Sequence, residues 1–283
     1  MILRTSDQEL VAYYESKTQT ILRRYGPGPR VHYHTGLVDV ANPSPATART
    51  LREDLVAAQE LTLRYAAELW RVRSIAFEEV LDVGCGLGGG AIFWAQEFNA
   101  HVTAITIAPS HLYWVEKFAT EAGVQSRVQP LLCDALQVPG DRGFDAVIAI
   151  DSSSSFPRKG WFKRLAEILR PGGHVLITDC FLERTEYQDL FNRHWCSTIG
   201  TIGEYRDAAR NAGLREELVE DVSHLAAPFW TMTLDLIKCE AQRKTLSVSE
   251  TAKVEESVRA HGMVRQGLVD GGLRYALMSF RKD

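Results

Sequence analysis

Three glycines at a strict spacing are the residues of this sequence best suited to bind a ligand. Gly84, Gly86 and Gly89 fit the pattern G-x-G-x-x-G and follow the apolar run 80–83. Glycine lets the backbone turn sharply there and lets a ligand approach the main chain. The helical pattern 91–97 then offers free N–H groups to an anionic group. The pattern predicts a strand, a turn and a helix start, and a turn without a ligand is the alternative.

A histidine-rich segment near the N-terminus offers acid-base chemistry. His32 and His34 are two residues apart, so their side chains point to the same face if the segment is extended. Either histidine is a candidate for a general base or a substrate contact. Metal binding is disfavoured, because no third ligand follows at a recognisable spacing. The alternative is that both histidines only anchor a loop.

Asp151 is a third candidate for catalysis. It follows the apolar run 144–150 and precedes four serines. A carboxylate there suits a positively charged intermediate, and the alternative is an N-cap for the next helix. His194 is a further candidate base. Aromatic residues expected to line an apolar substrate pocket are Tyr14, Phe181, Phe191, Trp195 and Phe229. Several of these are expected to be core instead, and Tyr14 fits the apolar face of a first helix.

Alternating strand and helix patterns place these residues. Strand patterns lie at 80–83, 101–107, 128–133, 144–150 and 174–179, with a turn at 170–173. Continuous apolar strands between helices predict a Rossmann-like, doubly wound, mostly parallel α/β sheet, whose ligands bind beyond the carboxyl ends of the strands. Late strand patterns at 217–222 and 274–280 predict an antiparallel C-terminal edge.

The remaining helical patterns predict additions to this sheet. A pattern from about 46 to 73 follows a turn at 42–45, so residues 1–75 are expected to form an N-terminal helical arm or cap. Residues 76–283 then form the ligand-binding domain, with lid helices inserted at about 181–203 and 225–270. The Gly-Pro hinge at 26–29 allows the arm to dock on a second copy, which makes a homo-oligomer an expectation.

Composition excludes several classes of protein. The 283 residues carry a net charge of −4, which gives no electrostatic footprint for binding nucleic acid. No apolar run approaches the roughly 18 residues of a membrane span, and the N-terminus lacks a signal pattern. The five cysteines form no C-x-x-C pair, as expected of reduced, mostly buried thiols. We therefore expect a cytoplasmic protein whose partner is a small molecule.

Four motifs in order resemble those of the class I S-adenosylmethionine-dependent methyltransferases, over residues 75 to 223. They are LDVGCG at 81–86, CDA at 133–135, FDAV at 144–147 and LRPGG at 169–173. The stretch VTAITIAP at 102–109 is similar to the branch that contains ubiquinone, sterol, tocopherol, terpenoid and bacterial natural-product methyltransferases. The resemblance therefore implies S-adenosyl-L-methionine as cofactor and S-adenosyl-L-homocysteine as product.

The resemblance also implies roles for individual residues. The loop and Asp82 are expected to hold the amino-acid end of the cofactor, and Asp134 its adenine amine. Thr106 stands near the position where many relatives carry an acidic residue for the ribose, and His111 where this branch often has glutamine. The residues implied around the cofactor are Asp82, Gly84, Cys85, Gly86, Thr106, His111, Asp134, Ala135 and Ile150.

The expected substrate is a small, largely apolar metabolite, a terpenoid or an aromatic natural product. The branch resemblance slightly favours methyl transfer to carbon, for which Asp151 and aromatic side chains matter most. Transfer to oxygen is the alternative, and a histidine base such as His34 or His194 matters most for it. A non-catalytic binding module and an NAD(P)-dependent enzyme are the remaining alternatives.

Overall fold

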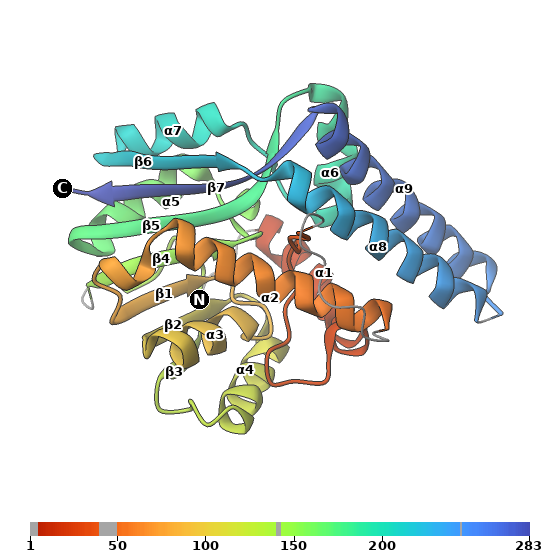
Figure 1. Ribbon diagram of the computed structural model, residues 1–283, viewed down its shortest axis with the longest axis horizontal. Helices are drawn as coiled ribbons and strands as arrows, with labels where there is room; N and C mark the ends of the chain where they lie inside the picture. Colours follow the sequence, from red (N-terminus) through yellow and green to blue (C-terminus); the bar gives the residue numbers. More distant parts are fainter. Residues whose placement is uncertain (1–4, 40–49, 140–142, 244) are drawn as a thin grey trace.

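The protein is a seven-stranded mixed sheet flanked by helices. The computed structural model describes residues 5–39, 50–139, 143–243 and 245–283 (Figure 1), and within them the strand order is β3-β2-β1-β4-β5-β7-β6. Strands β1 to β5 pair with one another in parallel, and β7 is antiparallel to both β5 and β6. The strands are β1 (Glu79–Val83), β2 (His101–Thr106), β3 (Val128–Leu132), β4 (Phe144–Ile150), β5 (Leu169–Leu182), β6 (Leu214–Asp221) and β7 (Leu273–Lys282). The predicted fold class, including its antiparallel edge, is confirmed.

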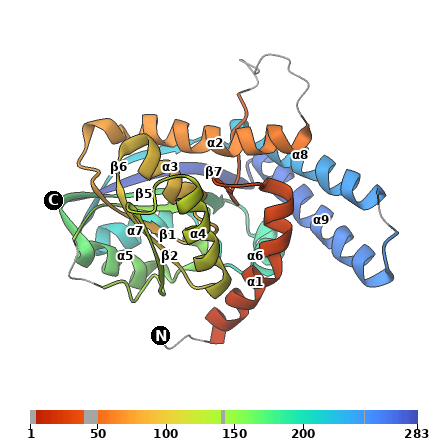
Figure 2. The same cartoon turned by 90° about the horizontal axis from the view of Figure 1, so that it is seen from below.

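Helices cover both faces of this sheet. The α-helices are α1 (Thr5–Tyr25), α2 (Leu51–Leu69), α3 (Gly89–Phe98), α4 (Pro109–Glu121), α5 (Arg158–Ile168), α6 (Gln188–Trp195), α7 (Ile202–Asn211), α8 (Ser223–Gln242) and α9 (Val248–Asp270). The short 3₁₀ helices are η1 (Val72–Ser74), η2 (Ser153–Ser155) and η3 (Thr185–Tyr187). Figure 2 shows α2 and α8 along one face of the sheet, and α5 and α7 along the other.

Side chains that alternate along the strands fill two cores. Val80 and Ile148 pack into the core under α2, α3 and α8, while Leu81 and Val147 pack into the core with α5 and α7. All four side chains are fully buried. Because both faces of these parallel strands are buried, the sequence of each strand is a continuous apolar run.

Two element boundaries differ from the sequence prediction. The predicted turn at 170–173 lies inside β5, where Gly172 has φ +79° and the pairing with β4 shifts register. The lid predicted at about 225–270 consists of α8, which begins earlier at Ser223, and α9, which Ser247 and Glu250 start with a capping box. The predicted turn at 42–45 lies outside the described residues.

The N-terminal segment joins the core of the sheet. An extended segment, residues 30–38, hereafter the strap, connects α1 toward α2. The Leu37 N–H donates to the Ala58 carbonyl at 3.0 Å, and Leu55 of α2 is fully buried in the core that α2 shares with the sheet. The domain boundary at residue 75 stays a prediction, but α2 packs as a core helix.

Candidate active site

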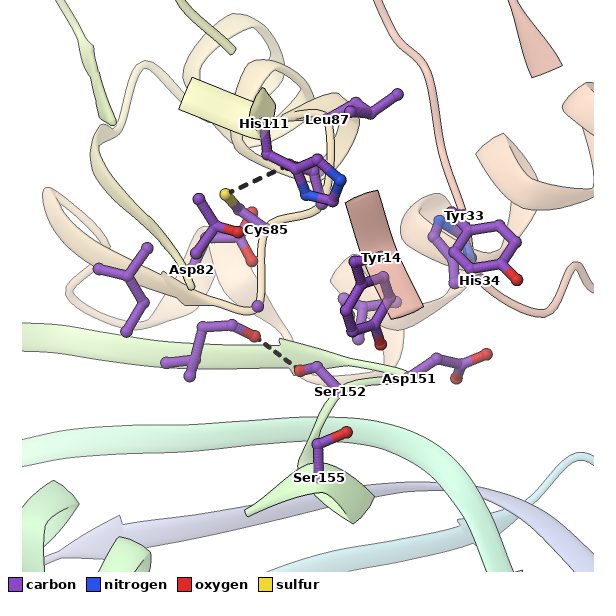
Figure 3. Close-up of a pocket in the computed structure, with 18 of the residues that line it drawn as sticks. Tyr14, Tyr33, His34, Asp82, Cys85, Leu87, His111, Asp151, Ser152 and Ser155 are labelled. Atoms are coloured by element: carbon purple, nitrogen blue, oxygen red, sulfur yellow. Dashed lines mark hydrogen bonds between the residues drawn. The ribbon is translucent and has the colours of Figure 1, made fainter. Parts of the chain in front are cut away.

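A pocket lies beyond the carboxyl ends of β1, β2 and β4, as an open parallel sheet requires. We call it the loop pocket; it encloses about 960 Å³ including its mouth. Sequence-predicted residues that line it are Asp82, Gly84, Cys85, Gly86, Thr106, His111, Ala135 and Ile150. In Figure 3, Tyr14 of α1 lies between His111 on one side and His34 on the other, so α1 covers the pocket.

The three glycines of the loop serve different purposes. A Cβ on Gly84 would lie 2.6 Å from the Ser152 Cβ, and one on Gly89 would lie 2.5 Å from the Val31 carbonyl oxygen of the strap. Gly86 has φ +54°, and a Cβ there would meet nothing within 4 Å. Gly84 and Gly89 therefore permit close packing of protein on protein. Gly86 instead leaves space for a ligand against the main chain.

Asp82 gives the loop pocket a buried negative charge. Its exposure is 4%, and the Ala91 N–H donates to its carboxylate. Among the described residues that line the pocket, none is a lysine or an arginine. Burial raises the pKa of Asp82 to about 7. A carboxylate in this state suits a ligand that brings its own ammonium group.

His111 also lines this pocket, and its Nδ1 is a hydrogen-bond acceptor without a partner among the described residues. Thr18 of α1 donates its hydroxyl to the Tyr14 carbonyl at 3.0 Å, so it accepts from His111 Nε2 at 3.2 Å. Nε2 then carries the proton, and buried Nδ1, which has no partner among the described residues, keeps its lone pair. Burial lowers the pKa of His111 to about 4, so the ring is neutral. Such a nitrogen suits a hydroxyl donor, as on a ribose.

Two other predicted cofactor residues have local partners. Thr106 Oγ1 accepts from the Ala108 N–H at 3.1 Å, which uses one lone pair of its hydroxyl. Cys133 and Ala135 line the loop pocket on either side of Asp134, whose Oδ1 accepts from the Leu136 N–H at 2.7 Å. A role for Asp134 in binding adenine stays a prediction.

A second cavity, the inner chamber, continues from the loop pocket toward α6, α8 and α9. It encloses about 740 Å³ including its opening. Tyr14, Tyr33, His34, Asp151 and Ser155 line both cavities. These five residues therefore mark the junction, where a group bound in one cavity meets a group bound in the other.

His34 stands at the junction as a neutral imidazole with one free nitrogen. Its Nδ1 donates to the Thr35 carbonyl at 3.0 Å, and its Nε2 is buried with no partner among the described residues. Burial first, and then the neighbouring His32, lower the pKa of His34 to about 3. The rings of His32 and His34 lie 5.1 Å apart, as predicted for one face. His32 itself donates to Glu60 at 2.9 Å and lines only the loop pocket.

Asp151 faces the same junction in a strained conformation. Its φ of +47° is uncommon for a residue other than glycine. Its carboxylate accepts from the Thr35 N–H at 2.6 Å and from the Tyr275 hydroxyl at 2.8 Å. Burial, followed by the nearby Asp179, raises its pKa to about 7. Strain held in place by two long-range hydrogen bonds is typical of a functional position.

Four predicted substrate contacts line the inner chamber, namely Tyr14, Phe191, Trp195 and Phe229. Phe181 does not, and this prediction is corrected: side chains alternate along β5, so Cys180 faces the chamber and Phe181 packs on Tyr205 in the opposite core. His194 is corrected too, because it lines neither cavity and packs against the rings of Trp195 and His261.

Sequence reasoning missed several residues of the site. Tyr33 and Thr35 lie beside the two predicted histidines, and the polar composition of that segment was their only signal. His261 lines the chamber from the middle of α9, and Tyr275 reaches Asp151 from β7. Nothing in their local sequence marks them, because a single polar residue in a helix or strand has no distinctive spacing.

The fold and the loop pocket together define an S-adenosylmethionine-dependent methyltransferase. The loop pocket suits that cofactor in three ways: Gly86 leaves room at the main chain, Asp82 suits the ammonium group and His111 suits a ribose hydroxyl. The family model described as a methyltransferase domain matches residues 80–173.

Proteins of similar sequence are methyltransferases as well. The 27-O-demethylrifamycin SV methyltransferase of Amycolatopsis mediterranei is 30% identical over 217 residues, 73% of this chain and 78% of the relative. The geranyl diphosphate 2-C-methyltransferase of Streptomyces lasalocidi is 26% identical over 188 residues, 60% of this chain and 63% of the relative. The chain belongs to the S-adenosylmethionine-dependent methyltransferases that act on small molecules.

A solved structure shares the whole fold. Geranyl diphosphate C-methyltransferase from Streptomyces coelicolor A3(2), bound to Mg²⁺, geranyl diphosphate and S-adenosyl-L-homocysteine, has a TM-score of 0.78 at 17% identity and covers 100% of both chains. Within the described residues, no helix is long and apolar enough to cross a membrane. No group of three or more His, Cys, Asp or Glu in the same residues is arranged to hold a metal ion.

Proposed function

We propose that the chain transfers a methyl group to a hydroxyl oxygen of an uncharged, largely apolar natural product. The observation that carries this proposal is the free Nε2 of His34 at the junction of the two cavities. The sequence favoured transfer to carbon slightly. The polar groups at the junction favour oxygen instead, because a hydroxyl satisfies His34 and a bare alkene leaves it unpaired.

The charge of the inner chamber supports an uncharged acceptor. Among the described residues that line it, none is a lysine or an arginine, whereas Asp151 and Asp179 are both present. A phosphate or diphosphate would lack a cationic partner there and would face two buried carboxylates. The acceptor proposed here therefore differs from geranyl diphosphate, which is charged. Aromatic walls from Phe191, Trp195 and Phe229 favour an apolar ring system.

His34 is the residue proposed to take the acceptor proton. When bound, S-adenosylmethionine supplies an electrophilic methyl group, with its amino-acid end at Asp82 and the glycine loop. An oxygen that gains a methyl group is a strong acid until it loses its own proton, so a weakly basic imidazole is sufficient. Neutral His34 accepts that proton at Nε2, while the Thr35 carbonyl holds the ring through Nδ1. Tyr14 and α1 exclude water from the junction.

Transfer to carbon is the second candidate, and one observation favours it. The Asp151 carboxylate and the ring of Tyr14 both face the junction, where they would stabilise a carbocation. In that case Asp151, and not His34, is the residue whose loss removes most of the rate.

The chemical position of the new methyl group separates these candidates. The protein is incubated with methyl-labelled S-adenosylmethionine and a panel of naphthols, flavonoids and hydroxylated macrolides, with geranyl diphosphate as the charged comparison. We expect label as an O-methyl ether on the uncharged acceptors and none on geranyl diphosphate. Label on carbon would overturn the oxygen assignment. If the protein binds the cofactor but labels no acceptor, the alternative of a non-catalytic binding module gains support.

Helix α1 contributes to the loop pocket of the chain described here. Leu10, Tyr14 and Ile21 of α1 line the loop pocket of the same chain. Exchange of this helix between copies, which the Gly-Pro hinge allows, stays a proposal that gel filtration of the full chain tests. A cytoplasmic location is likewise proposed, on the free and buried thiols of Cys85, Cys133 and Cys180.

A further inference from the structure

The inner chamber has a second polar end, away from the loop pocket. Ser197, Trp230 and His261 line the inner chamber and do not line the loop pocket. They come from three separate parts of the chain: the segment after α6, helix α8 and helix α9. Tertiary packing therefore brings all three residues to the same chamber.

Two of these side chains carry polar atoms without a partner. Ser197 Oγ and Trp230 Nε1 are buried, and neither forms a hydrogen bond with the described residues. Leaving such a group unpaired in a protein costs about 1–3 kcal/mol. A ligand that pairs with these atoms would recover this cost.

His261 adds an acceptor beside these donors. Its Nδ1 lies 2.6 Å from the Ser257 carbonyl oxygen, which only accepts, so Nδ1 carries the proton. Burial is the main cause that lowers the pKa of His261 to about 3, and the ring is neutral. Its Nε2 therefore keeps a lone pair. The rings of His261 and Trp230 have centroids 5.4 Å apart, so the two side chains lie side by side in the chamber.

The residues that line the chamber favour a neutral ligand group over an anion. No lysine or arginine is among the described residues that line the chamber, and the carboxylates of Asp151 and Asp179 repel an anion. A carbonyl would accept from Trp230 but leave the His261 lone pair unpaired. A hydroxyl both donates to His261 and accepts from Trp230.

We propose that Ser197, Trp230 and His261 form a distal subsite that binds a second, neutral hydroxyl group of the acceptor. This inference rests on the proposed function and narrows its substrate class to molecules with at least two hydroxyl groups, one at His34 and one at the distal subsite. The aromatic rings of Phe229 and Trp195 enclose the apolar part of the molecule. The distal hydroxyl orients the acceptor and takes no part in the chemical step.

Matched probes test the distal subsite by calorimetry on protein saturated with S-adenosylhomocysteine. We expect 2,6-dihydroxynaphthalene to bind about tenfold more tightly than 2-naphthol, because its second hydroxyl adds hydrogen bonds worth about 1.4 kcal/mol in total. In Trp230→Phe and in His261→Phe this ratio should fall to about one. The acid 6-hydroxy-2-naphthoate should bind less tightly than 2-naphthol. A ratio near one in the unmodified protein would overturn the subsite.

A control variant separates the subsite from a general loss of stability. Trp70→Phe removes another buried indole N–H without a partner, in the core at the end of α2, and should keep the tenfold ratio. Each variant is first checked for unchanged affinity for S-adenosylhomocysteine. As a second measurement on the intact protein, the Trp230 indole N–H resonance should shift with 2,6-dihydroxynaphthalene and not with 2-naphthol. No shift with either probe would count against the subsite.

Methylation of the same probes tests the proposed function independently. If both naphthols bind with the expected ratio but neither is methylated when S-adenosylmethionine replaces its product, the subsite stands and the oxygen assignment fails. If both are methylated with equal KM, the oxygen assignment stands and the subsite fails.

Discussion

The loop pocket and the inner chamber are built in different ways. The loop pocket is formed mainly by residues at the ends of three neighbouring strands, and its key features are a backbone turn and one buried carboxylate. The inner chamber shares α1 and the strap with the loop pocket, and its other walls come from α6, α8 and α9 and from residues on β5 and after β4. The backbone of the core thus determines the cofactor, whereas helix packing determines the acceptor.

Removal of the His34 lone pair should separate the two cavities most clearly. We expect His34→Gln to lower kcat about 10²- to 10⁴-fold, the usual contribution of a general base. Affinity for S-adenosylhomocysteine, measured by calorimetry, should change much less. His101→Gln at the exposed start of β2 is the control. If His34→Gln keeps its full rate while Asp151→Asn loses it, the carbon alternative is favoured.

Gly86→Ala should affect the loop pocket alone. The added Cβ enters space that the ligand needs, and overpacking by one methyl group costs about 1–3 kcal/mol, so affinity should fall about 5- to 150-fold. Gly123→Ala is a matched control, because Gly123 also has positive φ, +71°, and nothing within 4 Å of a built Cβ. Both variants should lose similar stability in thermal unfolding. Equal affinity in the two variants would show that no ligand lies against Gly86.

The pH dependence of cofactor binding should follow Asp82. Its pKa of about 7 in the free protein means that protons compete with the ligand ammonium below pH 7. Affinity for S-adenosylhomocysteine should therefore fall about tenfold between pH 7 and pH 5.5, because only the ionised carboxylate binds the cation. Asp82→Asn should bind weakly at both values and lose this dependence. A slope that persists in Asp82→Asn would assign it to another group.

The smallest effect is expected at the contact between Thr18 of α1 and His111 of the loop pocket. Thr18→Val removes the group that fixes the tautomer of His111, and loss of about 1 kcal/mol lowers cofactor affinity about fivefold. Thr18→Ser keeps the hydroxyl and should bind normally. Nitrogen shifts of His111 should report one tautomer in the unmodified protein and a mixture in Thr18→Val. One tautomer in both proteins would remove Thr18 from this role.

The sequence by itself determined the sheet, its antiparallel edge and the class of cofactor. Apolar periodicity is local, and the turn after Val83 requires glycine within a few residues, so both are visible along the chain. His34 and Asp151 were also identified, because each follows or lies in a distinctive local pattern.

Only the tertiary structure decided which residues line the inner chamber, the cavity proposed to bind the acceptor. The alternation along β5 turns Phe181 into the opposite core, and the packing of α6 against α9 keeps His194 behind Trp195. The same packing brings His261 into the chamber with no local signal. The physical reason is that a strand or helix pattern shows which side chains share a face. Which cavity that face meets depends on contacts between residues far apart in the chain.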